Sequence, residues 1–209
     1  MFPKIKEYIQ EAEKNFGNIP EERKLLLAKI SKYIAGKIKA GEKPELIYIC
    51  THNSRRSHFG QIWAKTAGTY YGIDNLQTYS GGTEATAFNP NAIRATITAG
   101  FEVEKDVKET NPNYKVRYQE NGDSILCFSK KYDDPANPQD GFCAIMTCTE
   151  ADGACPFVPG AVSRVSTPYN DPKAFDNTPA QDAKYNERCL QIATETLYVF
   201  SLVKNQLDE

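Results

Sequence analysis

The chain has 209 residues, of which 40% are hydrophobic and 25% are charged, and its formal net charge is -2. This length suffices for one well-buried core with a small appendage, and the composition is that of an ordinary globular protein. The weak net charge gives no basic field over the whole molecule, so a nucleic-acid partner is not indicated and any anion binding must be local.

No targeting or membrane segment is indicated. The sequence has no run of about 18 apolar residues, which predicts no membrane span, and residues 1–6 lack the apolar core of a secretory signal. We therefore expect a cytoplasmic protein, in a compartment where structural disulfides are disfavoured. The six cysteines are accordingly interpreted as thiols, catalytic groups or ligands and not as a disulfide framework.

Residues 4–39 show helical periodicity throughout. Apolar residues recur on one face before the break at 17–20 and on one face after it, which predicts a helical hairpin that ends before Pro44. We assign residues 1–43 to an N-terminal helical extension and residues 44–209 to the main domain.

From residue 46 onward, predicted strands alternate with predicted helices. This alternation favours an α/β fold, a short parallel sheet with helices on both faces. The strands are expected at 46–50, 76–80, 144–147 and 162–165, and the helices at 57–71, from Pro90 and at 181–204.

One segment departs from this alternation. Residues 114–118 and 124–128 have strand character and flank Asn121-Gly122, a pair that suits the positive φ angles of a two-residue hairpin turn. We therefore predict an inserted β-hairpin at about residues 112–130.

The most informative stretch of the sequence runs from Cys50 to Ser57. The apolar residues 46–49 lead as a strand into Cys50, Arg56 follows six positions later, and Ser57 suits the opening of a helix. In this order a thiolate can attack an oxyanion, because loop amides and the helix N-terminus direct positive partial charge at the anion. The same charges lower a cysteine pKa to roughly 3.5–7.5, and an arginine forks two hydrogen bonds onto phosphate or arsenate. The alternative is a buried cysteine at a strand end beside a surface basic pair.

Three motifs, in this order along the chain, resemble those of the low-molecular-weight protein-tyrosine phosphatases and of the thioredoxin-coupled arsenate reductases with the same fold. The Cys50–Ser57 stretch resembles their active-site loop. Residues 147–156 are similar to the redox segment of the reductases, in which two cysteines flank a mobile loop, and residues 169–172 resemble the Asp-Pro element. The resemblance covers about residues 46–204.

The resemblance implies roles for the residues of the loop. Cys50 is the expected nucleophile and Arg56 the group that neutralises charge in the transition state. Asn53 is expected to brace the loop and Ser57 to donate a hydrogen bond to the thiolate, the alternative for Ser57 being a plain helix N-cap. The residues expected to bind substrate are Thr51, His52, Asn53, Ser54, Arg55 and Ser57.

Asp171 is the expected general acid, because it begins the Asp-Pro element that the resemblance assigns to protonation of the departing oxygen. The alternative is that Asp171-Pro172 is merely a turn. Residues 133–135 form a second Asp-Asp-Pro element, which we interpret as a loop turn because it precedes the 144–147 strand.

Two cysteines distinguish the activities that the resemblance allows. In a reductase, Cys148 attacks the Cys50 adduct with arsenate, and Cys155 then takes over the disulfide, which a thioredoxin-like donor reduces. A phosphatase needs no second thiol, because water hydrolyses its phosphocysteine. The resemblance therefore implies an arsenate reductase acting on an arsenate or phosphate-type oxyanion, with a phosphomonoester phosphatase as the alternative. A third reading is an anion-sensing adaptor with an unreactive Cys50.

Three residues depart from the family pattern. His52 stands where the family usually has glycine, and the backbone there is expected to need a positive φ. Arg55 replaces a small residue and adds a second cation beside Arg56. Gln61 replaces a glutamate that helps to hold potassium in the reductases, so no potassium site is carried over, and neither a metal nor a cofactor is predicted.

The remaining candidate ligands are interpreted as structural. Zinc at Cys143, Cys148 and Cys155 is disfavoured, because their spacing is not a paired short pattern and no histidine follows. His52 and His58 are expected to be neighbours of the substrate site and not its base. The residues assigned to core packing are Cys127, Cys143, Cys189 and Trp63.

Overall fold

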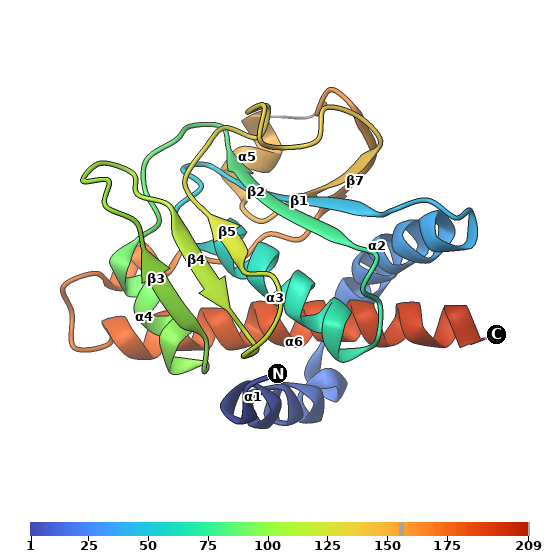
Figure 1. Cartoon of the computed structure of the whole chain (residues 1–209), viewed down its shortest axis with the longest axis horizontal. Helices are drawn as coiled ribbons and strands as arrows, with labels where there is room; N and C mark the ends of the chain where they lie inside the picture. The colour runs from blue at the N-terminus through green and yellow to red at the C-terminus, as the bar shows by residue number, and fades with distance from the viewer. Residues whose placement is uncertain (155–156, 209) are drawn as a thin grey trace.

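A computed structural model of the chain describes residues 1–154 and 157–208. Its centre is a four-stranded parallel sheet with the strand order β2-β1-β6-β7 (Figure 1). The strands of this sheet are β1 (Glu45–Cys50), β2 (Gln77–Gly82), β6 (Phe142–Met146) and β7 (Ala161–Ser166). The predicted α/β fold class is therefore confirmed.

Helices cover both faces of this sheet, as the sequence predicts (Figure 1). The larger layer contains α3 (Arg56–Tyr70) and α6 (Gln181–Asp208), and the opposite face carries the short α5 (Thr149–Ala154). The connection from β2 toward the antiparallel strands contains α4 (Pro90–Thr98), which begins at the predicted proline with Asn89 as its N-cap.

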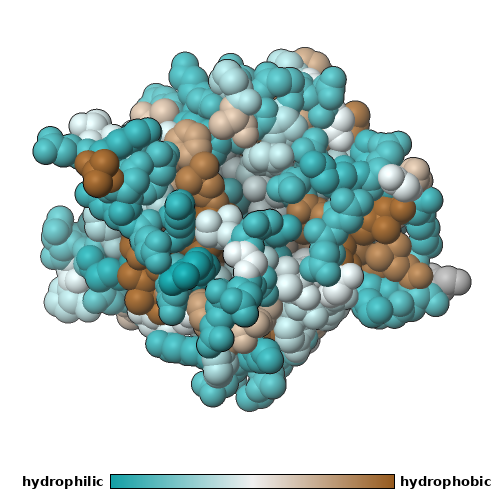
Figure 2. All heavy atoms as spheres, in the orientation of Figure 1, coloured by the Kyte–Doolittle hydropathy of each residue, from teal (hydrophilic) through white to brown (hydrophobic). Residues whose placement is uncertain are grey.

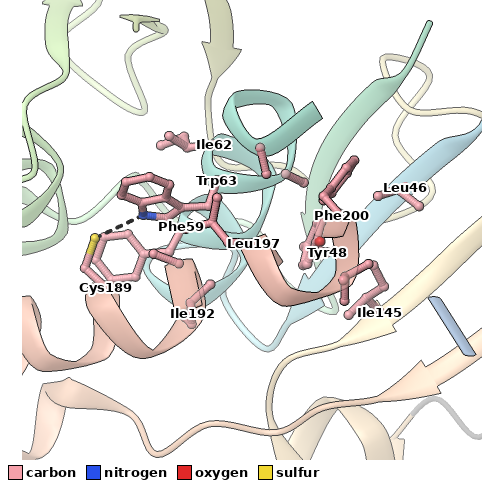
Figure 3. Close-up of a cluster of buried hydrophobic side chains, with 14 of the residues drawn as sticks. Leu46, Tyr48, Phe59, Ile62, Trp63, Ile145, Cys189, Ile192, Leu197 and Phe200 are labelled. Carbon is pink, nitrogen blue, oxygen red and sulfur yellow. Dashed lines mark hydrogen bonds between the residues drawn. The ribbon is translucent and has the colours of Figure 1, made fainter. Parts of the chain in front are cut away.

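Alternate side chains of each central strand reach separate hydrophobic clusters, because successive residues of a strand point to opposite faces. Leu46, Tyr48 and Ile145 belong to the same cluster as the fully buried Trp63 of α3, and in Figure 3 they lie on the side of Phe200 of α6. Ile47 and Met146 join the cluster under α5. Strands buried on both faces explain the unbroken apolar runs in the sequence.

The predicted hairpin is part of a three-stranded antiparallel sheet with the order β3-β4-β5. Its strands are β3 (Glu102–Lys105), β4 (Tyr114–Arg117) and β5 (Ile125–Cys127). The pairing of β4 with β5 agrees with the prediction, but β3 was not predicted. The expected two-residue turn is wrong, because residues 118–124 form a longer loop in which only Gly122 has a positive φ.

The N-terminal residues form α1 (Pro3–Lys14), the short 3₁₀ helix η1 (Phe16–Asn18) and α2 (Glu21–Lys39). Both long helices contact α6, and their apolar residues belong to the same hydrophobic cluster as α3 and α6. Hydrophilic side chains cover most of the face shown in Figure 2, with smaller hydrophobic areas between them. Within the described ranges, no helix is both long and apolar enough to cross a membrane.

Two helical glycines give a direct test of the packing. A Cβ at Gly60 would lie 2.2 Å from the ring of Tyr48, whereas a Cβ at Gly36 would meet no atom within 4 Å. We expect Gly60→Ala to lower the free energy of unfolding by about 1–3 kcal/mol through overpacking. The control Gly36→Ala should raise it by about 0.5–1 kcal/mol through helix propensity. Urea denaturation of both variants measures the difference, and equal effects would contradict the packing of α3 on β1.

Candidate functional site

The predicted site residues within the described ranges meet at the carboxyl edge of the parallel sheet. Cys50 ends β1 and pairs with Gly82 at the end of β2. Cys148 follows β6, and Asp171 follows β7 as the N-cap of the 3₁₀ helix η2 (Pro172–Phe175). Because parallel strands bring their carboxyl ends to one edge, residues about 120 positions apart in sequence become neighbours.

Residues 51–55 connect β1 to α3 and curl tightly against the end of β2. A Cβ at Gly82 would lie 2.7 Å from both Asn53 N and Thr51 O, so only glycine allows this approach. The amide of Glu84 donates to Thr51 O at 2.8 Å, and the amide of Thr83 donates to Cys50 O at 3.2 Å. The loop is therefore held from β2 as well as from its own two ends.

The left-handed residue of the loop is Asn53, with φ 44°. The expectation of a positive φ at His52 is wrong, since His52 is not among the described residues with positive φ. Asparagine tolerates this region better than most residues because its short polar side chain forms local hydrogen bonds. The turn at Asn53 directs its amide toward the first turn of α3.

That amide belongs to a hydrogen-bond chain with a defined direction. The backbone N–H of Lys130 donates to Asn53 Oδ1 at 2.9 Å, which leaves Nδ2 to donate to Ser57 Oγ at 2.8 Å. Ser57 Oγ lies 3.1 Å from Cys50 Sγ. Since Ser57 already accepts from Asn53, its own hydrogen is available for the sulfur. The N-cap reading of Ser57 is wrong, because the N-cap of α3 is Arg55.

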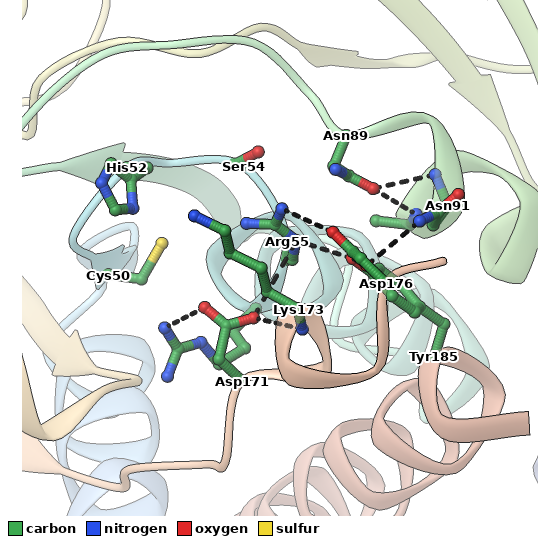
Figure 4. Close-up of polar contacts among 12 residues, drawn as sticks. Cys50, His52, Ser54, Arg55, Asn89, Asn91, Asp171, Lys173, Asp176 and Tyr185 are labelled. Carbon is green, nitrogen blue, oxygen red and sulfur yellow. Dashed lines mark hydrogen bonds and ion pairs between the residues drawn. The ribbon is translucent and has the colours of Figure 1, made fainter. Parts of the chain in front are cut away.

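Arg56 connects the loop to the segment that follows β7. Its Nη1 donates to Tyr169 O and its Nη2 to Asp171 Oδ2, each at 2.8 Å. Arg56 Nε is buried without a hydrogen-bond partner, an unmatched donor within the site. Asp171 also accepts from the amide of Lys173 at 3.0 Å, so it caps η2 and pairs with arginine at once (Figure 4).

The side chain of Arg55 points toward the segment around η2, as Figure 4 shows. Arg55 Nε donates to Tyr185 Oη at 2.8 Å, and the guanidinium lies 3.7 Å from Asp176 and 3.9 Å from Asp171. Arg55, the second cation of the loop, is therefore paired with carboxylates, which offset the positive charge that it adds beside Arg56.

Cys148 is buried and lies directly beside the loop. Its Sγ is 3.4 Å from Thr51 Oγ1 and accepts from the amide of Ala151 at 3.3 Å. Burial raises the pKa of the Cys148 thiol, although Thr51, Ala151 and the charge of Arg56 act in the opposite direction. Residues 149–154, expected as a loop, form α5. Cys155 lies outside the described residues.

Three other cysteines are buried in the packing positions that the sequence predicts. Burial raises the pKa of Cys127 and of Cys143 to about 12 and that of Cys189 to about 11, so these thiols stay protonated at neutral pH. Cys143 and Cys148 belong to clusters on opposite faces of the sheet. They cannot share one zinc ion, which removes the zinc interpretation.

The remaining loop residues contact neighbouring segments. Ser54 Oγ donates to Ala87 O at 2.7 Å, and His52 lies at the surface with Nε2 3.7 Å from Glu84. Ser129 Oγ donates to His52 O at 3.0 Å. Gln61 donates to a carbonyl of β2 and to a carbonyl of β5, so it joins the two sheets.

Several contacts of the site were not predicted. Lys130, Tyr169 and Tyr185 bond to Asn53, Arg56 and Arg55. They lie 77, 113 and 130 positions from these partners. No local pattern marks them, and only the Asp-Pro element pointed to the neighbourhood of Tyr169.

Known proteins share both the sequence pattern and the fold. An arsenate reductase of Bacillus cereus is 28% identical over 130 residues, covering 62% of this chain and 78% of the relative. One of Bacillus licheniformis is 27% identical over 146 residues, covering 70% and 86%. A low-molecular-weight phosphotyrosine phosphatase of Vibrio cholerae has a TM-score of 0.51 at 13% identity, covering 76% of this chain and 95% of that chain. The chain has the low-molecular-weight phosphatase fold.

A low-molecular-weight protein-tyrosine phosphatase of Bacillus subtilis has the same fold, with a TM-score of 0.51, 12% identity, and coverage of 77% of this chain and 97% of that chain. No protein-family model matches the chain. The resemblance predicted from the sequence is nevertheless confirmed, as is the prediction of an enzyme of this fold.

The two functions of Asn53 can be separated by substitution. Asn53→Gly keeps the left-handed backbone and removes the amide, whereas Asn53→Ala removes both. We expect Asn53→Ala to be less stable than Asn53→Gly by about 0.5–1 kcal/mol in urea denaturation. Both variants should show slower alkylation of Cys50 by iodoacetamide, because Ser57 loses its donor from Asn53. Alkylation at the wild-type rate in both variants would contradict the proposed direction of the hydrogen bonds from Asn53 through Ser57 to Cys50.

His58 predicts an acid-sensitive stability. It is fully buried against Phe88, and burial, with a contribution from Lys130, lowers its pKa from 6.5 to about 3. The unfolded chain therefore binds more protons than the folded one between these values. The contribution of His58 is fully present above pH 6.5 and is lost as pH falls, by about 1.4 kcal/mol for each pH unit.

The chain has two histidines, so His52→Gln is a matched control for His58→Gln. We expect His58→Gln to flatten the decline of unfolding free energy between pH 6.5 and pH 4, and His52→Gln to leave that slope unchanged. Denaturation at stepped pH measures both slopes. Parallel curves for His58→Gln and wild type would show that His58 does not stay neutral.

Proposed function

We propose that this chain is an arsenate reductase-like enzyme that uses the Cys50 thiolate and a Cys148/Cys155 disulfide relay. The observation that supports a reductase most strongly is the position of Cys148. Its buried thiol lies 3.4 Å from the hydroxyl of Thr51, the residue next to Cys50. A second thiol beside the nucleophile serves electron transfer and has no use in simple hydrolysis.

In the proposed first step, Cys50 Sγ attacks the arsenic atom of arsenate. Ser57 stabilises the thiolate, while the amides of the loop and the N-terminus of α3 receive the oxygens of the anion. Arg56 Nε, which is buried and unpartnered, supplies a further donor. The positive charge of Arg56 offsets the charge that develops as the sulfur–arsenic bond forms.

Asp171 is the proposed acid for the departing oxygen. In this structure its carboxylate is paired with Arg56 Nη2. An oxyanion that takes the guanidinium fork competes for this donor, because a carboxylate and an oxyanion bind arginine through the same geometry. Substrate binding thus releases Asp171 to face the oxygen that leaves as water.

The second step supplies the electrons. Cys148 Sγ attacks Cys50 Sγ, the sulfur–arsenic bond breaks, and its electron pair stays on arsenic, which passes from As(V) to As(III) as arsenite leaves. The two sulfurs form a disulfide. Cys155 then attacks Cys148 and releases Cys50 as thiolate, and a thioredoxin-type donor reduces the Cys148–Cys155 disulfide. A cytoplasmic location, where such donors act, belongs to the same proposal.

The alternative function is hydrolysis of a phosphomonoester through a phosphocysteine. It is favoured by the pair of Arg56 and Asp171, which suffices for phosphoryl transfer without any second thiol. Phosphotyrosine would need an aromatic wall at the site. Phe175 of η2, an exposed aromatic residue whose ring centre lies 5.5 Å from the Lys184 ammonium, would supply only part of that wall.

Arsenate treatment with disulfide mapping tests the proposal. After a single turnover we expect a Cys148–Cys155 disulfide in the wild type and a trapped Cys50–Cys148 disulfide in Cys155→Ala. Because burial raises the pKa of Cys148, the trapped disulfide should form faster as pH rises above 7. Cys127→Ser is the matched control, since Cys127 is buried away from this relay and should leave the disulfide pattern unchanged.

Two results would separate the candidate functions. Arsenate-dependent disulfides that vanish in Cys50→Ala support the reductase. If arsenate produces no disulfide while aryl phosphates are hydrolysed, and Cys50→Ala abolishes that hydrolysis, the phosphatase stands and the relay is excluded.

A further inference from the structure

The N-terminal extension reaches the segment that carries Asp171. Arg23, in the first turn of α2, donates through Nη2 to Pro168 O at 3.2 Å. Its guanidinium carbon lies 4.8 Å from the centre of the Tyr169 ring. One side chain of α2 therefore contacts two consecutive residues of the short stretch between β7 and η2.

A buried carboxylate completes this cluster. Glu195 of α6 accepts from Arg23 Nε at 2.8 Å and from Tyr169 Oη at 2.8 Å, both at Oε2. The side chains of Arg23 and Glu195 are 14% and 6% exposed. A charge-assisted pair with so little exposure to water has a better defined geometry than a surface pair.

Tyr169 carries this geometry into the catalytic edge. Its amide donates to Thr147 O at 3.0 Å, and its carbonyl accepts from Arg56 Nη1 at 2.8 Å. Asp171, two residues later, accepts from Arg56 Nη2. Residues 167–171 belong to neither a helix nor a strand, so the position of Asp171 depends on these contacts and not on a regular ladder.

We propose that Arg23 is a positioning residue for the general acid: with Glu195 it holds Tyr169, and Tyr169 sets the place of Asp171 beside Arg56. The inference rests on the proposed role of Asp171 and assigns a function to the extension of residues 1–43. Arg23 itself touches neither the substrate nor the reacting atoms.

The consequence of a displaced acid depends on the leaving group. A good leaving group departs without a proton, whereas a poor one needs the acid. We therefore expect Arg23→Gln to lower kcat/KM for phenyl phosphate at least about tenfold and that for 4-nitrophenyl phosphate less than about threefold. Because kcat/KM covers the steps up to loss of the phenol, later hydrolysis of the phosphocysteine does not mask this difference.

The control variants separate positioning from folding. Lys24→Gln alters the next residue of α2, whose ammonium pairs with Glu21 on the surface. This variant should leave kcat/KM unchanged for both phosphate esters. Tyr169→Phe removes only the hydrogen bond from the hydroxyl to Glu195. It should also lower kcat/KM more for phenyl phosphate than for 4-nitrophenyl phosphate, but by less than Arg23→Gln does. Arg23→Lys, which keeps the charge, should partly restore the rate with phenyl phosphate.

Hydrogen–deuterium exchange gives a readout that needs no turnover. The amide of Tyr169 should exchange faster in Arg23→Gln than in Lys24→Gln, while the amides of β1 stay protected in both. The proposal would be overturned if Arg23→Gln lowered kcat/KM equally for the two esters and left the exchange rate of the Tyr169 amide unchanged. A wild type inactive toward both esters and toward arsenate would contradict the proposed function instead, and the exchange result would still decide the role of Arg23.

Discussion

The left-handed turn at Asn53 is the constraint on which the rest of the site depends. It lets the loop close against Gly82, where no side chain would fit, and it directs the asparagine amide toward Ser57 and so toward Cys50. Without this turn Cys50, the first turn of α3 and the end of β2 could not lie so close together. The direction of the hydrogen bonds from Asn53 to Ser57 is also fixed, because the first donor of the series is the backbone N–H of Lys130, which can only donate.

The parts of the fold that local sequence determines were predictable. Apolar runs leading into Cys50 and Cys148 marked two central strands, and the absence of alternation in these runs agrees with burial on both faces. The unpredicted strand β3 has three exposed charged residues and only one apolar residue. It is defined by pairing with β4 and not by its own pattern, and such tertiary effects override propensity.

In the site, too, some features are determined by local sequence and others by tertiary contacts. The residues of the Cys50 loop are contiguous, so their spacing alone indicated an anion-binding turn. Lys130, Tyr185 and Arg23 come from separate parts of the chain, and their contacts exist only because the fold brings them to the edge of the sheet. The misplaced left-handed residue has a related cause. A family pattern suggested His52, whereas the side chain of the residue that takes the turn, Asn53, is bonded by the distant amide of Lys130, a contact that no local pattern marks.

The three buried thiols in the packing layers have a consequence for the flow of oxidising equivalents. Cys127, Cys143 and Cys189 are held in the protonated form, away from water. Exchange with a disulfide requires a thiolate. Because these three thiols stay protonated, they do not take part in disulfide exchange within the core. Thiol chemistry at Cys50 and Cys148 can thereby proceed at the edge of the sheet without involving the thiols of the packing layers. The number of cysteines in the chain is therefore a poor guide to its vulnerability to oxidation.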